Sequence, residues 1–154
     1  MIEIERKFLV DIKKWNPIGA GIKMKQGYLS VDPERVVRVR LAGETAFLTI
    51  KGNPKGISRT EMEYKIPVNE ATILMGMCLN KPVEKMRYKE KIGDFTWEID
   101  VFEGINQGLV LAEIELENEI QEFKFPEWIE KEVSDDFRYF NAWLSENPFT
   151  TWKH

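Results

Sequence analysis

Apolar and polar residues alternate along most of this chain, which is the pattern of β-strands with two unlike faces. We expect strands at Ile2–Val10, Lys25–Val31, Val36–Leu41, Ala46–Lys51, Arg59–Ile66, Pro82–Ile92, Phe95–Phe102 and Val110–Leu116. Glycine-containing turns at Gly43-Glu44 and Gly93-Asp94 separate two pairs of these strands at hairpin spacing. Eight strands spaced in this way favour an antiparallel barrel or sandwich.

Helix signals are few and short. We expect helices at Glu70–Leu79 with Asn69 as its cap, at Glu119–Phe123, and from Asp135 or Asp136 to about Glu146. No internal repeat or linker divides the sequence. The chain is therefore predicted to be one mainly β domain over residues 1–154, with a few packed helices that include one near its C-terminus.

One face of the predicted strands carries an unusual number of charges. It contains eight acids, namely Glu3, Glu5, Glu61, Glu63, Glu98, Asp100, Glu113 and Glu115. It also contains seven bases, namely Lys7, Arg38, Arg40, Lys51, Arg59, Lys85 and Arg87. Acids follow acids on four strands and bases follow bases on two. Neighbours on one face of a strand are about 6.6 Å apart, so these pairs of like charge repel each other.

Alternation alone also fits an ordinary sandwich with one solvated face. A face selected only for solubility, however, interleaves the two signs, and so many charges would not suit a dry barrel interior. Segregated clusters suit a ligand that brings the missing charge. A polyphosphate with divalent metal ions is such a ligand, because Arg and Lys bind phosphate oxygens and carboxylates bind Mg²⁺.

Composition narrows the kind of metal and the kind of partner. The net charge of −4 predicts no nucleic-acid partner. Cys78 is the only cysteine and His154 the only histidine, so a bound metal would use carboxylates, which favours Mg²⁺ or Mn²⁺ over zinc. The sequence opens on a charged strand and has no membrane-length apolar run. We therefore expect a cytoplasmic protein without a membrane partner.

The charged positions also match a known family in order along the chain. Glu3-x-Glu5-x-Lys7 resembles the ExExK signature of the CYTH superfamily, the triphosphate tunnel metalloenzymes. The further matching segments are Gln26-Gly27-Tyr28-Leu29, Arg38-Val39-Arg40, Thr49-Ile50-Lys51, Ser58-Arg59-x-Glu61-x-Glu63, Lys85-Met86-Arg87-Tyr88, Glu98-Ile99-Asp100-Val101-Phe102, Ala112-Glu113-Ile114-Glu115-Leu116 and Arg138-Tyr139-x-Asn141. The resemblance runs from residue 2 to about residue 141, which is nearly the whole chain.

This resemblance implies an eight-stranded antiparallel tunnel barrel that binds a small-molecule triphosphate with Mg²⁺ or Mn²⁺. It implies a metal-binding set of Glu3, Glu5, Glu61, Glu63, Asp100, Glu113 and Glu115, whereas Glu98 matches less firmly. It implies a phosphate-binding set of Lys7, Arg38, Arg40, Lys51, Arg59, Lys85 and Arg87. The small size and the Gln-Gly-Tyr-Leu segment resemble the compact bacterial branch, in which hydrolysis of inorganic tripolyphosphate is common.

The catalytic base and the substrate stay open at this point. No histidine is placed to accept a proton, so Glu63, or Lys85 with a lowered pKa, is the expected base. The alternatives are a class IV-type adenylate cyclase, a thiamine or nucleoside triphosphatase, and a non-catalytic polyphosphate-binding module. The large acidic set argues against the last, since binding alone needs the bases more than the acids. A homodimer is a further possibility.

Overall fold

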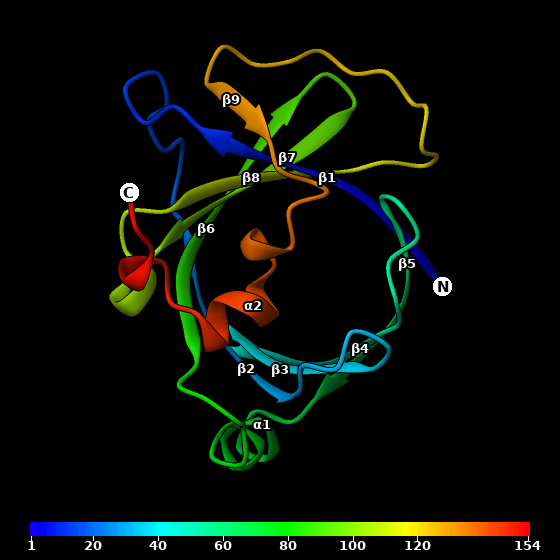
Figure 1. The fold of residues 1–154 in the computed structure, drawn as a ribbon, viewed down its shortest axis with the longest axis vertical. Helices are drawn as coiled ribbons and strands as arrows, with labels where there is room; N and C mark the ends of the chain where they lie inside the picture. The colour runs from blue at the N-terminus through cyan, green and yellow to red at the C-terminus, as the bar shows by residue number, and fades with distance from the viewer.

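The computed structural model describes residues 1–154, and its strands far exceed its helices in number and length (Figure 1). The strands are β1 (Ile2–Val10), β2 (Ile22–Ser30), β3 (Val36–Ala42), β4 (Thr45–Lys51), β5 (Ser58–Ile66), β6 (Val83–Ile92), β7 (Phe95–Phe102), β8 (Val110–Glu115) and β9 (Ile129–Glu132). The helices are α1 (Val68–Met75) and α2 (Asn141–Glu146). Single 3₁₀ turns lie at Gly104–Asn106, Phe137–Tyr139 and Phe149–Thr151.

Eight of the strands form a closed antiparallel barrel. The strand order is β5-β4-β3-β2-β6-β7-β8-β1, and β1 also pairs with β5. The first half of β1 pairs with β5, from Ile2↔Thr60 to Ile4↔Ser58, and its second half pairs with β8, from Glu5↔Glu115 onward. This double use of β1 closes the ring seen end-on in Figure 1. The predicted eight-stranded antiparallel barrel is confirmed.

The main hydrophobic core lies outside the barrel wall. Phe8, Trp97, Ile99, Ala112 and Ile114 point outward from β1, β7 and β8 and form one buried cluster with Trp15 and Trp128. The connection between β8 and β9 crosses this outer face, where Phe123 packs edge-on against Trp97 with ring centroids 5.5 Å apart. Since successive side chains of a strand face opposite ways, an apolar outer face leaves the charged face for the lumen.

This connection between β8 and β9 consists of turns and irregular backbone, so the helix predicted at Glu119–Phe123 is wrong. Phe123 also packs against Phe8, and the Arg6 guanidinium lies 5.0 Å from the Phe123 ring centroid. These contacts to strands far away in sequence hold the segment against the barrel, and a short polar helix would not make them. The strand β9, which pairs with β1, was not predicted, because its four residues include three charges.

Helix α1 covers the outer face of β3 and β4, where Ala71 is buried with Val39 and Ala46. It begins after Pro67, whose side chain makes no capping bond, and not after Asn69 as predicted. It ends near Gly76, before the predicted end at Leu79. The Leu79 N–H donates to the Tyr28 carbonyl of β2 at 2.9 Å, so the chain is tied to the barrel there and leaves the helical path.

The C-terminal segment enters one end of the barrel. The single helix predicted from Asp135 or Asp136 to Glu146 is instead a 3₁₀ turn and α2, interrupted at Phe140, whose ψ is 136°. The Asp136 carboxylate accepts a bond from the Arg138 N–H and so caps the 3₁₀ turn rather than a helix. Figure 1 shows this segment inside the ring of strands. No helix is long and apolar enough to cross a membrane.

Packing fixes the C-terminal segment at the end of the barrel where β1 and β7 end. Leu144 of α2 is fully buried in a second cluster with Val83, Phe102, Leu109, Leu111 and Val133. The Val133 N–H also donates to the Lys7 carbonyl of β1 at 2.8 Å. The barrel is therefore closed at this end by the chain's own last residues.

Candidate functional site

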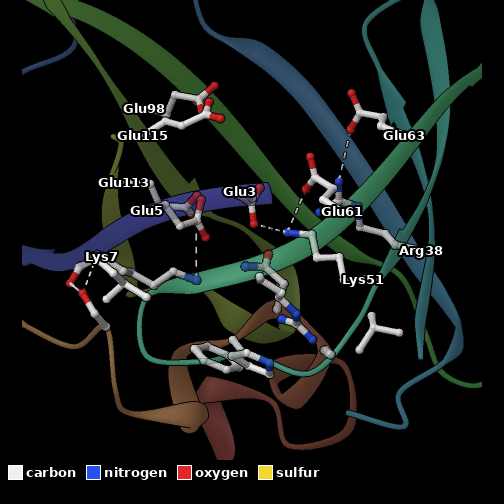
Figure 2. A pocket seen from close by; sticks show the side chains of 18 of the residues that line it. Glu3, Glu5, Lys7, Arg38, Lys51, Glu61, Glu63, Glu98, Glu113 and Glu115 are labelled. Carbon is white, nitrogen blue, oxygen red and sulfur yellow. Dashed lines mark hydrogen bonds and ion pairs between the residues drawn. The ribbon is translucent and has the colours of Figure 1, made fainter. Parts of the chain in front are cut away.

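The barrel lumen contains a cavity of about 280 Å³. Only five of the 24 residues that line it are hydrophobic. The lining includes Glu3, Glu5, Lys7, Arg38, Arg40, Lys51, Arg59, Glu61, Glu63, Lys85, Arg87, Glu98, Glu113 and Glu115, together with Ser134, Phe140, Asn141 and Ala142 of the C-terminal segment. Figure 2 shows the labelled side chains converging on this space. All of the predicted site residues except Asp100 therefore line one cavity.

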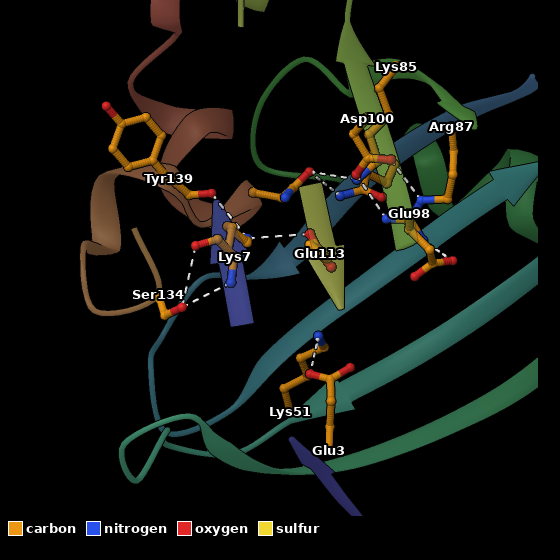
Figure 3. A network of polar contacts seen from close by, with 12 residues as sticks. Glu3, Lys7, Lys51, Lys85, Arg87, Glu98, Asp100, Glu113, Ser134 and Tyr139 are labelled. Atoms are coloured by element: carbon orange, nitrogen blue, oxygen red, sulfur yellow. Dashed lines mark hydrogen bonds and ion pairs between the residues drawn. The ribbon is translucent and has the colours of Figure 1, made fainter. Parts of the chain in front are cut away.

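Asp100 lies directly behind the lining and binds two of the bases (Figure 3). Its carboxylate accepts from Arg87 Nε at 2.7 Å and from Arg87 Nη2 at 2.9 Å, and it pairs with Lys85 Nζ at 2.7 Å. Burial alone would raise the pKa of Asp100, but Arg87 and Lys85 override it and lower that pKa to about 2. Asp100 is thus ionised and fixes these two bases at the closed end.

Lys85 is the most deeply buried base of the site, with no exposed surface. Its ammonium also donates to Asn141 Oδ1 at 3.1 Å. Burial lowers the pKa of Lys85 to about 7, since an ammonium loses its hydration there, and the nearby Arg87 and Arg40 add to the shift against the pull of Asp100. Lys85 is therefore the base most easily deprotonated in the cavity.

Arg38 and Arg40 lie side by side on the inner face of β3 and leave positive charge uncompensated. Burial, with Arg38 and Arg87 nearby, lowers the pKa of Arg40 to about 9, and Arg40 makes no ion pair. Arg38 pairs with Glu63 at 3.7 Å, yet its Nε is buried without any acceptor. A buried donor without a partner costs about 1–3 kcal/mol. An anionic oxygen in the cavity would supply that partner, which is how a phosphate group fits this site.

The acids are distributed around the rest of the lumen. Lys51 Nζ lies 3.0 Å from Glu3 and 3.3 Å from Glu61, and it holds these two carboxylates together. Lys7 Nζ lies 3.5 Å from Glu113 and also donates to the Tyr139 carbonyl at 3.2 Å. The cation–acid pairs of the lumen thus link strands that are far apart in the sequence (Figure 3).

Glu5 and Glu115, which face each other in the β1–β8 ladder, form no ion pair. Burial raises the pKa of Glu5 to about 8, and its neighbours Glu113 and Glu3 add to the shift. Burial likewise raises the pKa of Glu115, with Glu3 and Glu98 adding to it. This part of the lumen lacks positive charge in the same way that the Arg40 region lacks negative charge.

The donor chemistry here suits a hard divalent cation. Carboxylate oxygens are the protein ligands of Mg²⁺ and Mn²⁺, and a cation would compensate Glu5 and Glu115, which form no ion pair with a side chain. As they stand, no three acidic side chains are gathered closely enough to hold an ion. Mg²⁺ often takes only one or two protein carboxylates and completes its shell with water and phosphate, so the residues fit such an ion.

Comparison with known proteins agrees with this geometry. The sequence model of the CYTH domain family matches residues 1–141. The chain belongs to the CYTH family. It is 47% identical over 152 residues to an inorganic triphosphatase of Acetivibrio thermocellus, and the aligned region covers 98% of this chain and 97% of the relative. It is 38% identical over 149 residues to an inorganic triphosphatase of Nitrosomonas europaea, and the aligned region covers 94% of this chain and 97% of that relative.

A solved structure supports the same assignment. The crystal structure of an inorganic triphosphatase matches this CYTH chain at 36% identity, with 93% of each chain covered and a TM-score of 0.65. The recognition of the family from its ordered charged motifs is thereby confirmed.

Two residues of this CYTH chain have more contacts at the site than the sequence suggested. Gln26 and Asn141 each belong to a segment that matches the family, but the sequence did not predict either of them as a site residue. In the structure Gln26 Nε2 donates to Asn141 Oδ1 at 2.9 Å, and each amide holds a base of the cavity. The sequence offered one signal for Gln26. It lies two residues before Tyr28 on the same strand, so the two side chains share one face of that strand.

Proposed function

We propose that this protein hydrolyses inorganic tripolyphosphate inside its barrel with the aid of Mg²⁺ or Mn²⁺. The observation that carries the proposal is the cavity itself, because it has a cluster of bases at its closed end and uncompensated carboxylates nearby. A chain of anionic phosphates with a bound divalent cation satisfies both. The names of the relatives support this choice of substrate class.

The residues divide into two groups in this proposal. Phosphate oxygens are bound by Lys7, Arg38, Arg40, Lys51, Arg59, Lys85 and Arg87. The metal is held by residues from Glu3, Glu5, Glu61, Glu63, Glu113 and Glu115, among which Glu5 and Glu115 have no competing cation. Asp100, also expected in this set, is bound to Arg87 and Lys85 behind the lining and positions these bases instead. A bound divalent ion would neutralise phosphate charge and acidify a coordinated water. Positioning and charge compensation by these side chains account for most of the catalysis of phosphoryl transfer.

One side chain must also accept the proton of the attacking water. Glu63 and Lys85 are the candidates, and both line the cavity. We favour Lys85, because its lowered pKa of about 7 makes the neutral amine available near neutral pH. Glu63 is less enclosed, with 42% of its side chain exposed, and it already pairs with Arg38.

A substrate panel tests the proposal. The purified protein is incubated with tripolyphosphate, ATP, thiamine triphosphate or pyrophosphate, each with Mg²⁺, with Mn²⁺ or with excess EDTA. We expect phosphate release from tripolyphosphate with either metal and none with EDTA. Full activity in EDTA would exclude the metal-dependent reaction. Tight binding of tripolyphosphate without any turnover would instead indicate a binding module.

Two further expectations belong to the proposal. The first is a cytoplasmic location, which fits a chain with one free cysteine, Cys78. The second is a homodimer that covers Ile50, Met62 and Tyr64, which are exposed on the outer face of β4 and β5. Sedimentation of the wild type and of Met62→Asp tests the dimer, because a charge in that face would favour the monomer.

A further inference from the structure

Two neutral amides lie among the bases at the closed end of the cavity. Gln26 of β2 is fully buried, and its Oε1 accepts from Arg40 Nε at 2.8 Å. Its Nε2 donates to Asn141 Oδ1 at 2.9 Å and to the Tyr28 hydroxyl at 3.2 Å. Asn141, the first residue of α2, also accepts from Lys85 Nζ at 3.1 Å through the same oxygen. The amides thus link Arg40 to Lys85 in one hydrogen-bonded chain.

These contacts differ from those of Lys51, Lys7 and Arg87 in the lumen. Lys51, Lys7 and Arg87 are each held by carboxylates, which neutralise part of their charge. Arg40 is held by an amide oxygen and forms no ion pair, and Lys85 divides its bonds between Asp100 and an amide oxygen. An amide oxygen orients a cation through a hydrogen bond but brings no negative charge, so the cation can still attract phosphate in full.

We propose that Gln26 and Asn141 are positioning residues that fix Arg40 and Lys85 for the phosphate chain without adding negative charge beside them. This rests on the proposed function, because the charge is preserved for an anionic substrate. It also makes the C-terminal segment part of the site, since Asn141 reaches the cavity only when α2 is packed in the barrel end. A purely structural pair would need only shape and an acceptor at these positions.

Isosteric carboxylates separate the two roles. Asn141→Asp and Gln26→Glu keep the shape and the accepting oxygen but add a negative charge beside Lys85 or Arg40. Asn141→Ala removes the acceptor and adds no charge. A structural role predicts that alanine is the more harmful change, because it loses the bonds. The proposed role predicts that the carboxylates are more harmful to substrate binding, because they neutralise the bases.

The measurements are the KM for tripolyphosphate with Mg²⁺, the Kd for tripolyphosphate in EDTA, and the melting temperature. We expect Asn141→Asp and Gln26→Glu to raise KM and Kd at least about tenfold, and Asn141→Ala to raise them about threefold. Melting temperatures should stay within about 3 °C of the wild type for the carboxylate variants, since each new charge meets a buried cation. Asn118→Asp is the matched control, because Asn118 is exposed on the connection between β8 and β9. It adds the same charge and should change neither KM nor Kd.

Several results would overturn the inference. Binding by Asn141→Asp within twofold of the wild type would do so, as would a greater loss for alanine than for aspartate. If Asn141→Asp does not fold, Gln26→Glu decides by the same criterion, with Gln26→Ala as its uncharged partner. Wild-type protein that neither binds nor hydrolyses tripolyphosphate would reject the proposed function itself, which is a different outcome from equal binding by wild type and variants.

Discussion

At the scale of single residues, Glu5 shows most directly how burial without a cationic partner changes the pKa of a lumen carboxyl group. It is enclosed in the lumen, forms no ion pair, and has a pKa raised to about 8 by burial and by the neighbouring Glu113. Near neutral pH the folded protein therefore retains a proton on Glu5 that the unfolded chain, with a carboxyl pKa of 4.5, has lost. A divalent cation at this position would displace that proton, so its binding should strengthen as pH rises toward 8.

The sign of the pH effect follows from proton binding. Because the folded state binds the extra proton, the free energy of unfolding contributed by Glu5 falls as pH rises from about 4.5 to about 8. Glu5→Gln should abolish this fall and raise the melting temperature of the metal-free protein at pH 8 by about 3 °C, while leaving it nearly unchanged at pH 4.5. Thermal melts in EDTA at both pH values measure it, and parallel curves for the two proteins would contradict it. The same substitution should remove most of the metal-dependent hydrolysis.

Lys85 makes a separate prediction about the rate. If its neutral amine accepts the water proton, kcat/KM for tripolyphosphate should rise with pH up to about 7 and then level off. Lys85→Arg keeps a positive charge but cannot lose it near neutral pH. We expect this variant to lose at least about 100-fold in kcat and to lose the dependence on pH below 7. An unchanged pH profile in Lys85→Arg would transfer the role to Glu63, to be tested by Glu63→Gln.

At the scale of secondary-structure elements, strands were predictable where one face is apolar and the other charged. Ile2–Val10 and Phe95–Phe102 were predicted with the bounds that the structure has. Their alternation is unbroken because the outer face packs in the core and the inner face meets the cavity. The strand β2 begins at Ile22, three residues before the predicted start, since Ile22 and Lys23 pair with β6 despite their weak pattern.

Elements fixed by distant contacts were not predictable in the same way. The Glu119–Phe123 segment is held by the outer face of β1 and β7, and the C-terminal segment is shaped by the inside of the barrel. The same holds within the site. Charged residues could be assigned to the lumen from their periodicity, but Gln26 and Asn141 carry no charge and meet across 115 residues of sequence.

The packing of α2 links this element to the chemistry of the cavity. Leu144→Ala removes a fully buried side chain from the cluster that anchors α2, and such substitutions cost about 2–5 kcal/mol. We expect a lower melting temperature together with a raised KM for tripolyphosphate, because Asn141 lies three residues before Leu144 in the same helix. Leu79→Ala is a matched control, since Leu79 is 57% exposed and should change stability by less than about 0.5 kcal/mol. An unchanged KM in a destabilised Leu144→Ala protein would contradict the link.

At the scale of the whole molecule, the barrel is arranged inside out relative to an ordinary small β protein. Its apolar clusters lie between the barrel wall and the covering segments, and its interior is polar and charged. The outer clusters supply the hydrophobic stabilisation, so the lumen is free to hold like charges close together. Closure of one end by the C-terminal segment leaves a ligand the opposite end as its way in. It places Lys7, Arg40 and Lys85 near the closed end of the cavity.

This arrangement leads to a prediction about which triphosphate is used. The bases come from five strands and surround a cavity of about 280 Å³, so a short phosphate chain can be contacted along its length. The nucleoside of ATP would have to replace some of these phosphate contacts, and the mostly polar lining offers little apolar surface to its nucleobase. We therefore expect kcat/KM for tripolyphosphate to exceed that for ATP by at least about tenfold, or roughly 1.4 kcal/mol of transition-state stabilisation.

The comparison is made by steady-state kinetics with both substrates under the same concentration of Mg²⁺, with the products separated by chromatography. Arg38→Ala and Arg40→Ala should each lower kcat/KM for tripolyphosphate, because each removes positive charge from the developing phosphoryl transition state. Any turnover of ATP should yield ADP and phosphate. Cyclic AMP and pyrophosphate as main products would instead identify a cyclase, and equal efficiency with the two substrates would show that the closed, base-lined end does not select the inorganic chain.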